Sequence, residues 1–452
     1  MQFIKAHKIT FYTFILTLVG LSILVITPPF QAPDEQTHLY RAYQISDGNL
    51  IAKHLSYGAG DVLPKSLSDS FQDYRYILFD ENAKNNKGLQ AASFNKPLNQ
   101  NDEIETRFEN TAPYPPLAYL PQILGVSIGK LFDASPVMLL YLARFFNLVF
   151  WLFIINWCMR RLPQASLAIF VFALVPIVAF QASSASADVA TAAISLLFIV
   201  EIARTFTLKK ISRSNIILLI ILGSILALCK MPYVLITLLS LSIPGGLFKS
   251  KKHEALSKAS ITLVPFLLTL LWLAVAYASF VNLQAVANPQ AQLSFILNNP
   301  IEFLQVLLRT YVGTPSDGLY VQMIGQLGWL DTKLPLWSIV FTFSAILVAA
   351  LTTRISNKIT VKSKVIVVTV LAITILSITG LLYLTWNSPG SPVVEGLQGR
   401  YYIPLFGLLL LSLAGSIKLA PSQLIRRDII VYSLIGLSTA GMLITLVTRY
   451  YA

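Results

Sequence analysis

The sequence is poor in charged residues, because Asp, Glu, Lys and Arg make up only 12% of its 452 residues. Soluble domains carry about 25% charged residues, so a soluble globular fold is excluded. Hydrophobic residues make up 55% of the chain, and its mean hydropathy is +0.67. Repeated uncharged runs of roughly 17–24 residues match the hydrocarbon thickness of a bilayer. We therefore predict an all-α polytopic membrane protein, which also excludes intrinsic disorder.

Cysteine and several catalytic motifs are scarce or missing. Cys158 and Cys229 lie far apart at the ends of apolar runs, so a disulfide-stapled scaffold is excluded and the redox compartment stays open. The sequence has no Walker loop and no HExxH, GxSxG or CxxC motif, so ATP hydrolysis, zinc proteolysis and serine hydrolysis lack local support. It also shows no internal repeat, unlike the inverted halves of many secondary transporters.

Eleven apolar runs predict about eleven transmembrane helices. The first follows Lys5 and Lys8 as a signal peptide would. The sequence PPFQAPDEQ behind it offers no small-residue cleavage site, so we expect an uncleaved span. The eleven runs fall at residues 9–28, 137–158, 163–181, 189–206, 214–230, 232–248, 259–281, 336–353, 364–386, 401–418 and 429–448.

Basic residues set the predicted orientation. Residues 114–132 are also apolar and would give a rival model of about twelve spans. If they lie outside instead, 19 of the 34 basic residues and only 3 of the 21 acidic ones fall on the cytoplasmic side. This satisfies the positive-inside rule, which the rival model violates. The net charge of +13 therefore reports topology and predicts no nucleic-acid partner.

The predicted organisation has one large outer segment near the start. Residues 1–28 form the first span with the N-terminus inside, and residues 29–136 form an extracytoplasmic loop with interfacial helices. Spans two to seven occupy 137–281, a second extracytoplasmic loop occupies 282–335, and spans eight to eleven occupy 336–452 with the C-terminus outside. Within the first loop we expect a mobile or partner-ordered segment at 48–112 and a helix lying flat on the membrane at 114–132.

Two adjacent acids, Asp34 and Glu35, come shortly after the first span. They fall in the predicted first turn of a helix, where the dipole favours anions, so both are expected to be ionised. Helical spacing would place Asp34, His38 and Arg41 on one face and Glu35 about 100° away. Such carboxylates can act as a base or as metal ligands. The alternative is that they only cap and solvate a surface helix.

Further ionisable residues are predicted near the outer ends of the spans. Asp188 stands in SASADVA, where an N-cap is the plain alternative. Arg144 lies inside the second span and needs a partner or a snorkelling route. Lys230 and Arg400 are cations on the outer side, so we expect an anionic partner, either a lipid phosphate or one of the acids. Arg400 with Tyr401 also fits an interfacial Arg and Tyr anchor.

An ordered set of motifs carries a family resemblance. These motifs are PPFQAPDEQTHLYRAYQISDG, TAPYPPLAYLP, SASADVA, CKMPY, GQLGWLD and LQGRYYIP. The chain resembles, from about Pro28 to Pro404, a bacterial membrane family catalogued as domain of unknown function 2142. That family is similar in architecture to the GT-C glycosyltransferase superfamily. The resemblance implies transfer of a sugar from a polyprenyl-phosphate donor to an envelope glycan or lipid acceptor, on the outer face of the bacterial cytoplasmic membrane.

The resemblance also implies roles for particular residues. Asp34 and Glu35 would be catalytic, with Asp34 as the general base of an inverting transfer. Asp34, Glu35 and Asp188 would be metal ligands if the reaction uses a divalent cation, Mg²⁺ or Mn²⁺, which the resemblance leaves open. The residues expected to bind substrate are His38, Arg41, Arg144, Asp188, Lys230, Arg400 and Tyr401.

Other functions make different demands on the sequence. A transporter or flippase of lipid-linked sugars or envelope polymer should carry several ionisable residues near the bilayer midplane, where the predicted spans are nearly bare. An O-antigen-ligase-like or polymerase-like enzyme has its large outer loop late in the chain, whereas here it comes first. A purely structural anchor would leave the charges at the outer rim unexplained.

Overall fold

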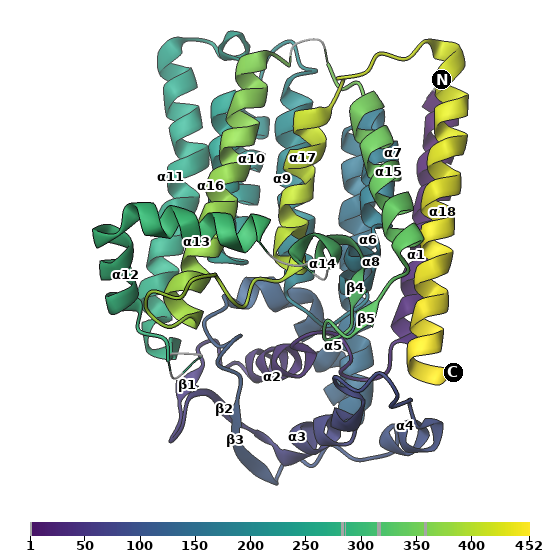
Figure 1. Cartoon of the computed structure of the whole chain (residues 1–452), viewed down its shortest axis with the longest axis vertical. Coiled ribbons are helices and arrows are strands. Elements are labelled where there is room, and N and C mark those ends of the chain that lie inside the picture. The colour runs from purple at the N-terminus through teal and green to yellow at the C-terminus, as the bar shows by residue number, and fades with distance from the viewer. Residues whose placement is uncertain (1, 282–283, 285, 314–317, 357–358) are drawn as a thin grey trace.

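The computed structural model describes residues 2–281, 284, 286–313, 318–356 and 359–452. It is mostly helical, with a bundle of roughly parallel helices and a smaller unit that contains a sheet at one end of the bundle (Figure 1). The chain begins at the opposite end of the bundle from this unit, and it finishes beside the unit. The predicted helical membrane architecture is thereby confirmed in outline.

Five helices are long and apolar enough to cross a membrane. They are α1 (Gln2–Ile26), α6 (Pro136–Arg161), α11 (Lys251–Val275), α16 (Val361–Trp386) and α18 (Pro421–Tyr451). A bent pair, Pro163–Ala173 with Pro176–Ala182, turns by 83° and would count as a sixth. Because Pro176 cannot continue the preceding helix, the predicted continuous span at 163–181 is instead broken into α7 (Ser166–Ala173) and α8 (Pro176–Ala182).

Shorter helices occupy the other predicted spans. They are α9 (Asp188–Thr205), α10 (Arg213–Ala227), the 3₁₀ helix η4 (Met231–Ser242), α15 (Leu336–Thr352), the 3₁₀ helix η7 (Gly399–Leu405) and α17 (Phe406–Leu413). Three acidic or basic side chains interrupt α9, and α10 is 15 residues long, about 22 Å at 1.5 Å per residue. The described residues thus hold five or six candidate spans, and the total of eleven stays a prediction.

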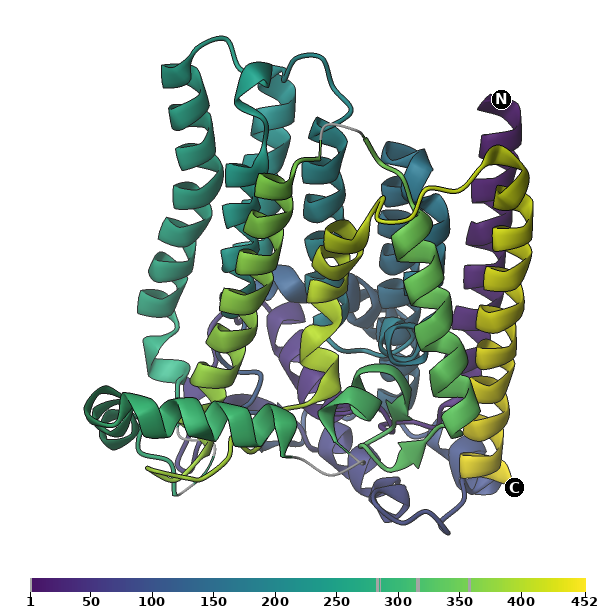
Figure 2. The same ribbon diagram turned by 45° about the horizontal axis from the view of Figure 1, so that its top comes forward.

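The first and last helices lie side by side along the bundle (Figures 1 and 2). The hydroxyl groups of Tyr12 and Tyr432 are 2.7 Å apart, and Lys8 pairs with Asp428 at 2.6 Å. At its other end α18 reaches the sheet-containing unit, where Arg449 donates to the carbonyl oxygen of Ile77 at 2.8 Å. The end of the chain therefore ties this unit to the bundle.

The segment predicted as a mobile loop at 48–112 is folded. It forms an antiparallel sheet in the order β1 (Lys53–His54), β2 (Ala59–Pro64), β3 (Glu103–Arg107), with α3 (Lys65–Gln72) and α4 (Lys87–Ser93) between strands two and three. Asp61, fully buried on β2, accepts a hydrogen bond from Gln44 at 2.8 Å. The prediction was wrong because polar composition conceals such buried contacts with α2 (Glu35–Ser46).

The apolar stretch at 114–132 forms a short turn and a short helix, η2 (Pro116–Tyr119) and α5 (Leu120–Leu131). Twelve residues span about 18 Å, too little for a transmembrane helix. A Cβ atom added to Gly125 would lie 2.6 Å from the carbonyl oxygen of Leu142. This glycine therefore allows α5 to pack directly on α6.

The second predicted outer segment, 282–335, contains α12 (Pro289–Asn298), α13 (Pro300–Val312), α14 (Leu319–Gly325), β4 (Gln326–Leu327) and β5 (Thr332–Lys333). Residues 282, 283, 285 and 314–317 of this segment lie outside the described residues. The sequence SFILNNPIEFLQVLLRTY at 294–311 predicts one short interfacial helix, but the structure has two there, because Pro300 starts a new one. Helix α13 lies across the direction of the bundle helices (Figure 2).

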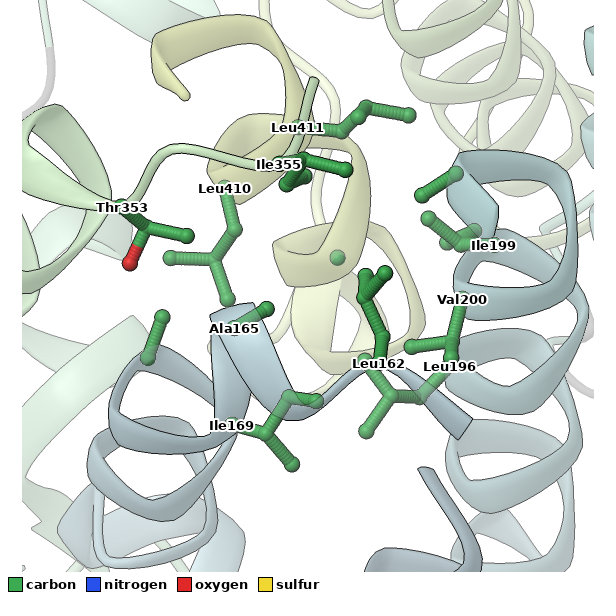
Figure 3. A pocket seen from close by; sticks show the side chains of 13 residues that line it. Leu162, Ala165, Ile169, Leu196, Ile199, Val200, Thr353, Ile355, Leu410 and Leu411 are labelled. Atoms are coloured by element: carbon green, nitrogen blue, oxygen red, sulfur yellow. The ribbon is translucent and has the colours of Figure 1, made fainter. Parts of the chain in front are cut away.

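An enclosed apolar cavity of about 40 Å³ lies between α7, α9 and α17 (Figure 3). Its labelled side chains are aliphatic apart from Thr353. Apolar cavities of this kind stay dry, and no charged side chain lines this one. A polar reaction site must therefore be sought elsewhere.

Candidate functional site

Arg144 fastens the turn between α1 and α2. Its guanidinium donates to the carbonyl oxygens of Thr27 at 2.7 Å and Pro28 at 2.9 Å, and it holds Glu35 through contacts of 2.6 and 2.8 Å. Both side chains are fully buried, and Glu35 also accepts the amide N–H of Ala185 at 3.0 Å. The protein itself thus occupies both oxygens of Glu35, so the geometry supports a positioning role for it rather than the predicted catalytic one.

Asp34 lies just before helix α2, not inside it. The helix begins at Glu35, and Asp34 has a φ of 59° in the left-handed region, which Asp tolerates better than most residues. Its side chain makes no capping hydrogen bond. The predicted helical stripe of Asp34, His38 and Arg41 is therefore wrong at its first member.

Asp34 is paired with Arg400, the second residue of η7. A guanidinium nitrogen of Arg400 contacts Oδ2 of Asp34, and another donates to the carbonyl oxygen of Pro33 at 3.1 Å. The side chain of Asp34 is 27% exposed, whereas that of Arg400 is 4% exposed. Burial alone would raise the pKa of Asp34, but the charge of Arg400 holds that pKa below its usual value. Asp34 is therefore ionised and still open to solvent.

A second ion pair joins Asp188 to Lys230 at 2.8 Å. Asp188 is the first residue of α9, and Ala187 stands at the N-cap position. Because its carboxylate binds Lys230 instead of the helix amides, the capping interpretation of Asp188 is wrong. Lys230 lies at the junction of α10 and η4, so this pair connects two segments that are 42 residues apart.

The two ion pairs adjoin each other. Asp188 and Arg400 line one small cavity of about 10 Å³, together with Gln181 of α8. Nε of Arg400 and Nε2 of Gln181 are buried without a hydrogen-bond partner in the described structure. A space of this size suits a single water molecule. Such a water, or an oxygen atom of a ligand, would satisfy both donors.

Tyrosine rings surround the cations. Nζ of Lys230 lies 5.2 Å from the ring centre of Tyr114 and 5.0 Å from that of Tyr401, and Arg400 also stands over Tyr401 at 5.5 Å. Tyr233 donates to the carbonyl oxygen of Tyr401 at 2.7 Å. Tyr401 therefore contacts both predicted cations, and the cation–π contacts fix where their charges lie.

His38 connects α2 with the turn before α9. Its Nδ1 lies 2.9 Å from the hydroxyl of Tyr119, and its Nε2 lies 3.1 Å from the hydroxyl of Ser186. Burial lowers the pKa of His38 to about 4, although the nearby charges of Asp188 and Asp34 raise it. The imidazole is therefore neutral at neutral pH, and through Ser186 it holds the turn before α9, whose first residue is Asp188.

Arg41 does not join the ion pairs. It is buried and donates to the carbonyl oxygens of Leu50 at 2.8 Å and Tyr114 at 2.9 Å. Its structural contribution is to hold the chain on either side of the sheet-containing segment. Of the nine predicted site residues, the structure thus brings six together: Asp34, His38, Asp188, Lys230, Arg400 and Tyr401.

Several supporting residues escaped the sequence analysis. Asn147 of α6 donates to the carbonyl oxygens of Ser184 at 2.8 Å and Ser186 at 2.9 Å, and Gln122 of α5 donates to that of Ala185 at 3.3 Å. These bonds hold the turn that presents Asp188. The sequence signals that could have found them are the side-chain amides of Asn147 and Gln122, each inside an apolar run, and the run of small residues before Asp188.

The three carboxylates predicted as metal ligands each have a cationic partner: Asp34 has Arg400, Glu35 has Arg144 and Asp188 has Lys230. Within the described residues, no group of three or more His, Cys, Asp or Glu side chains is arranged to hold a metal ion. With each carboxylate already paired with a basic side chain, this arrangement does not fit a divalent cation.

Comparison with known proteins gives one match. A family model described as "Predicted membrane protein (DUF2142)" matches residues 16–409. No curated protein and no solved structure matches the chain. The matched region includes both ion pairs of the site and the turns that hold them. The chain therefore belongs to the DUF2142 family of predicted membrane proteins.

Proposed function

We propose that this protein is a GT-C-like membrane glycosyltransferase. It transfers a sugar from a polyprenyl-phosphate donor to a glycan or lipid acceptor of the cell envelope. The reaction takes place on the outer face of the bacterial cytoplasmic membrane, which the protein crosses several times. The observation that carries the proposal is the junction of the Asp34–Arg400 and Asp188–Lys230 pairs at one end of the helix bundle.

The cations suit the phosphate of the carrier. Arg400 offers a planar fork of donors that matches phosphate oxygens, and its Nε has no partner in the described structure. Lys230 adds a second positive charge, and its ammonium group lies between the rings of Tyr114 and Tyr401. These two cations, with side chains 4% exposed for Arg400 and 16% exposed for Lys230, can neutralise the charge that develops on a departing phosphate.

We expect the ion pairs to rearrange when the donor binds. A carrier phosphate binding to Arg400 would take the place of Asp34, because both compete for the same donors. Loss of the Arg400 contact removes the main influence that lowers the pKa of Asp34, while burial continues to raise it. Donor binding therefore makes Asp34 a stronger base at the moment when a base is needed.

The transfer is a single displacement. Asp34 accepts the proton of an acceptor hydroxyl, and the oxygen of that hydroxyl forms a bond to the anomeric carbon. The bond between this carbon and the phosphate oxygen breaks, and its electron pair stays on the polyprenyl phosphate, next to Arg400 and Lys230. One displacement inverts the anomeric configuration.

The test is turnover of synthetic polyprenyl-phosphate sugars, carrying radiolabel in the sugar, by the purified full chain in lipid nanodiscs. We expect Asp34→Asn to lower turnover by roughly 10²–10⁴-fold, the usual contribution of a general base. The matched control is Asp73→Asn, which removes a similarly exposed carboxylate, paired with Lys96 in the same outer segment. Its turnover should equal that of the wild type.

Other outcomes change the assignment. Equal turnover by Asp34→Asn and wild type would overturn Asp34 as the base and move that role to Asp188, the carboxylate that lines the small cavity with Arg400. A lipid-linked sugar that the wild type moves across the bilayer with its carrier bond intact would support the transporter alternative instead. Under the proposal itself, Arg400→Gln should fold normally and lose the ability to bind the polyprenyl-phosphate sugar.

A further inference from the structure

A large hollow lies at the other end of the bundle, the end at which the chain begins. It has a volume of about 730 Å³ and lies between the first turns of α10 and α11. Lys210, Arg213 and Lys249 stand at its rim, and Ile216, Ile220 and Leu256 line its wall. A volume of this size is typical of ligand sites.

The cations at the rim are not neutralised by the protein. In the part of the chain that the structure describes, none of the three forms an ion pair, and Glu254, the acid of this region, is engaged with Lys258 at 2.7 Å. Elsewhere at this end of the bundle Arg161 and Arg204 share Glu201. The positive-inside rule explains why cations collect here, but it does not explain why three unpaired ones face one hollow.

Polar groups of the backbone and of a histidine add to the same rim. Helices α10 and α11 both begin here, capped by Ser212 and Ser250, so two helix dipoles present their positive ends. No acidic residue lies in the first turn of α10. Nδ1 of His253, a lining residue, is buried and has no hydrogen-bond partner. These groups together suit an anionic oxygen-rich ligand such as a phosphate.

The wall of the hollow suits a hydrocarbon chain. Ile217 and Leu256 line it and remain 44% and 59% exposed, respectively, although they belong to apolar helices. Leu256 belongs to the candidate span α11 and Ile217 to the shorter apolar helix α10, and exposed apolar side chains on such helices suit contact with lipid. The hollow thus combines a cationic rim at the end of the helices with an apolar wall that runs along them.

We propose that this hollow binds one anionic phospholipid, with its phosphate at Lys210, Arg213 and Lys249 and an acyl chain along α10 and α11. Cations close to a membrane surface attract anionic lipids in general. Here the hollow and the paired helix ends select a single molecule. This inference is independent of the glycosyl transfer proposed above.

The test is lipid retention by the purified full chain. The protein is equilibrated in mild detergent with equal amounts of phosphatidylglycerol and phosphatidylcholine, and the bound lipids are counted by native mass spectrometry. We expect the wild type to retain one phosphatidylglycerol. We expect the triple variant Lys210→Gln, Arg213→Gln and Lys249→Gln to lower this retention at least tenfold.

The control variant changes the charge equally at the same end of the bundle. It carries Lys362→Gln, Lys418→Gln and Arg426→Gln, three exposed residues outside the hollow, and its retention should match the wild type. Lys210→Arg with Lys249→Arg should also retain the lipid, which separates charge from folding. Equal loss in both triple variants, equal retention of the zwitterionic lipid, or displacement of phosphatidylglycerol by equimolar glycerol phosphate would each overturn the proposal.

Discussion

Asp34 and Glu35 are neighbours in the chain, yet the protein uses them in opposite ways. Glu35 is fully buried with Arg144, which also binds two backbone carbonyl oxygens. Asp34 keeps 27% of its side chain exposed and shares Arg400 with one backbone carbonyl. The difference arises from one backbone torsion, because the left-handed φ of Asp34 turns its side chain away from the helix that Glu35 begins. A group that is completely satisfied supports structure, whereas one that is partly open can react.

The largest effect should come from breaking the buried pair. Glu35→Ala would leave Arg144 buried and charged without a counter-ion, which typically costs about 3–5 kcal/mol. We expect a large fall in the unfolding temperature, measured by intrinsic fluorescence in detergent, and a low yield of folded protein. Asp34→Asn should unfold at a clearly higher temperature than Glu35→Ala, because Asn keeps a side-chain oxygen for Arg400 and the Asp34 side chain is partly exposed. Similar unfolding temperatures for the two variants would contradict the division of roles.

The next effect should appear in catalysis when the partner of Asp34 is removed. Arg400→Gln should lower kcat/KM by roughly 10²–10³-fold, as loss of one charge-stabilising donor does. It should also move the acid limb of the pH profile of kcat/KM to higher pH, because burial then raises the pKa of Asp34 without opposition from Arg400. Arg309→Gln, which removes an exposed pair with Glu302, is the control. An acid limb at the same pH in Arg400→Gln would argue against Asp34 as the titrating base.

A smaller effect should appear in the pH dependence of the unfolding free energy, to which the buried His38 of the site contributes. Burial lowers the pKa of His38 to about 4, whereas the unfolded chain titrates near its ordinary value of about 6.5. The unfolded state therefore binds more protons between these values, so stability should rise with pH from about 4 to 6.5. The expected gain is about 3 kcal/mol. His38→Gln should flatten this slope in urea unfolding measured at several pH values, and an unchanged slope would show that another group titrates.

The sequence predicted the helical membrane class and most of the residues that gather in the charged cluster. Positions next to the ends of apolar runs sufficed for Asp34, Asp188, Lys230 and Arg400, because a charge at such a boundary needs a partner whatever the tertiary fold. The partners themselves were not predictable. The Asp34–Arg400 pair joins residues 366 positions apart, and local periodicity carries no information about such a contact.

Two errors have the same physical origin. The expected helical stripe failed because the torsion of a single residue, Asp34, decides where α2 begins. The expected mobile loop failed because its order depends on single buried side chains, apolar ones such as Tyr74 and Phe108 as well as the polar contact of Gln44 with Asp61. Composition averages over many residues, so it describes spans well and describes such single contacts poorly.

The smallest effect tests whether exposure alone explains the behaviour of Asp34. Asp73 is 24% exposed, close to the 27% of Asp34, and it too is paired with a cation. The partners differ, since the side chain of Lys96 is 47% exposed and that of Arg400 is 4% exposed. Surface pairs contribute about 0–1 kcal/mol, so Asp73→Asn should change the unfolding free energy by no more than this and leave turnover unchanged. A larger change in the unfolding free energy or in turnover would mean that the sheet-containing segment takes part in the reaction. The special role of Asp34 could then not be attributed to its pairing with the buried Arg400, because an exposed carboxylate with an exposed partner would behave in the same way.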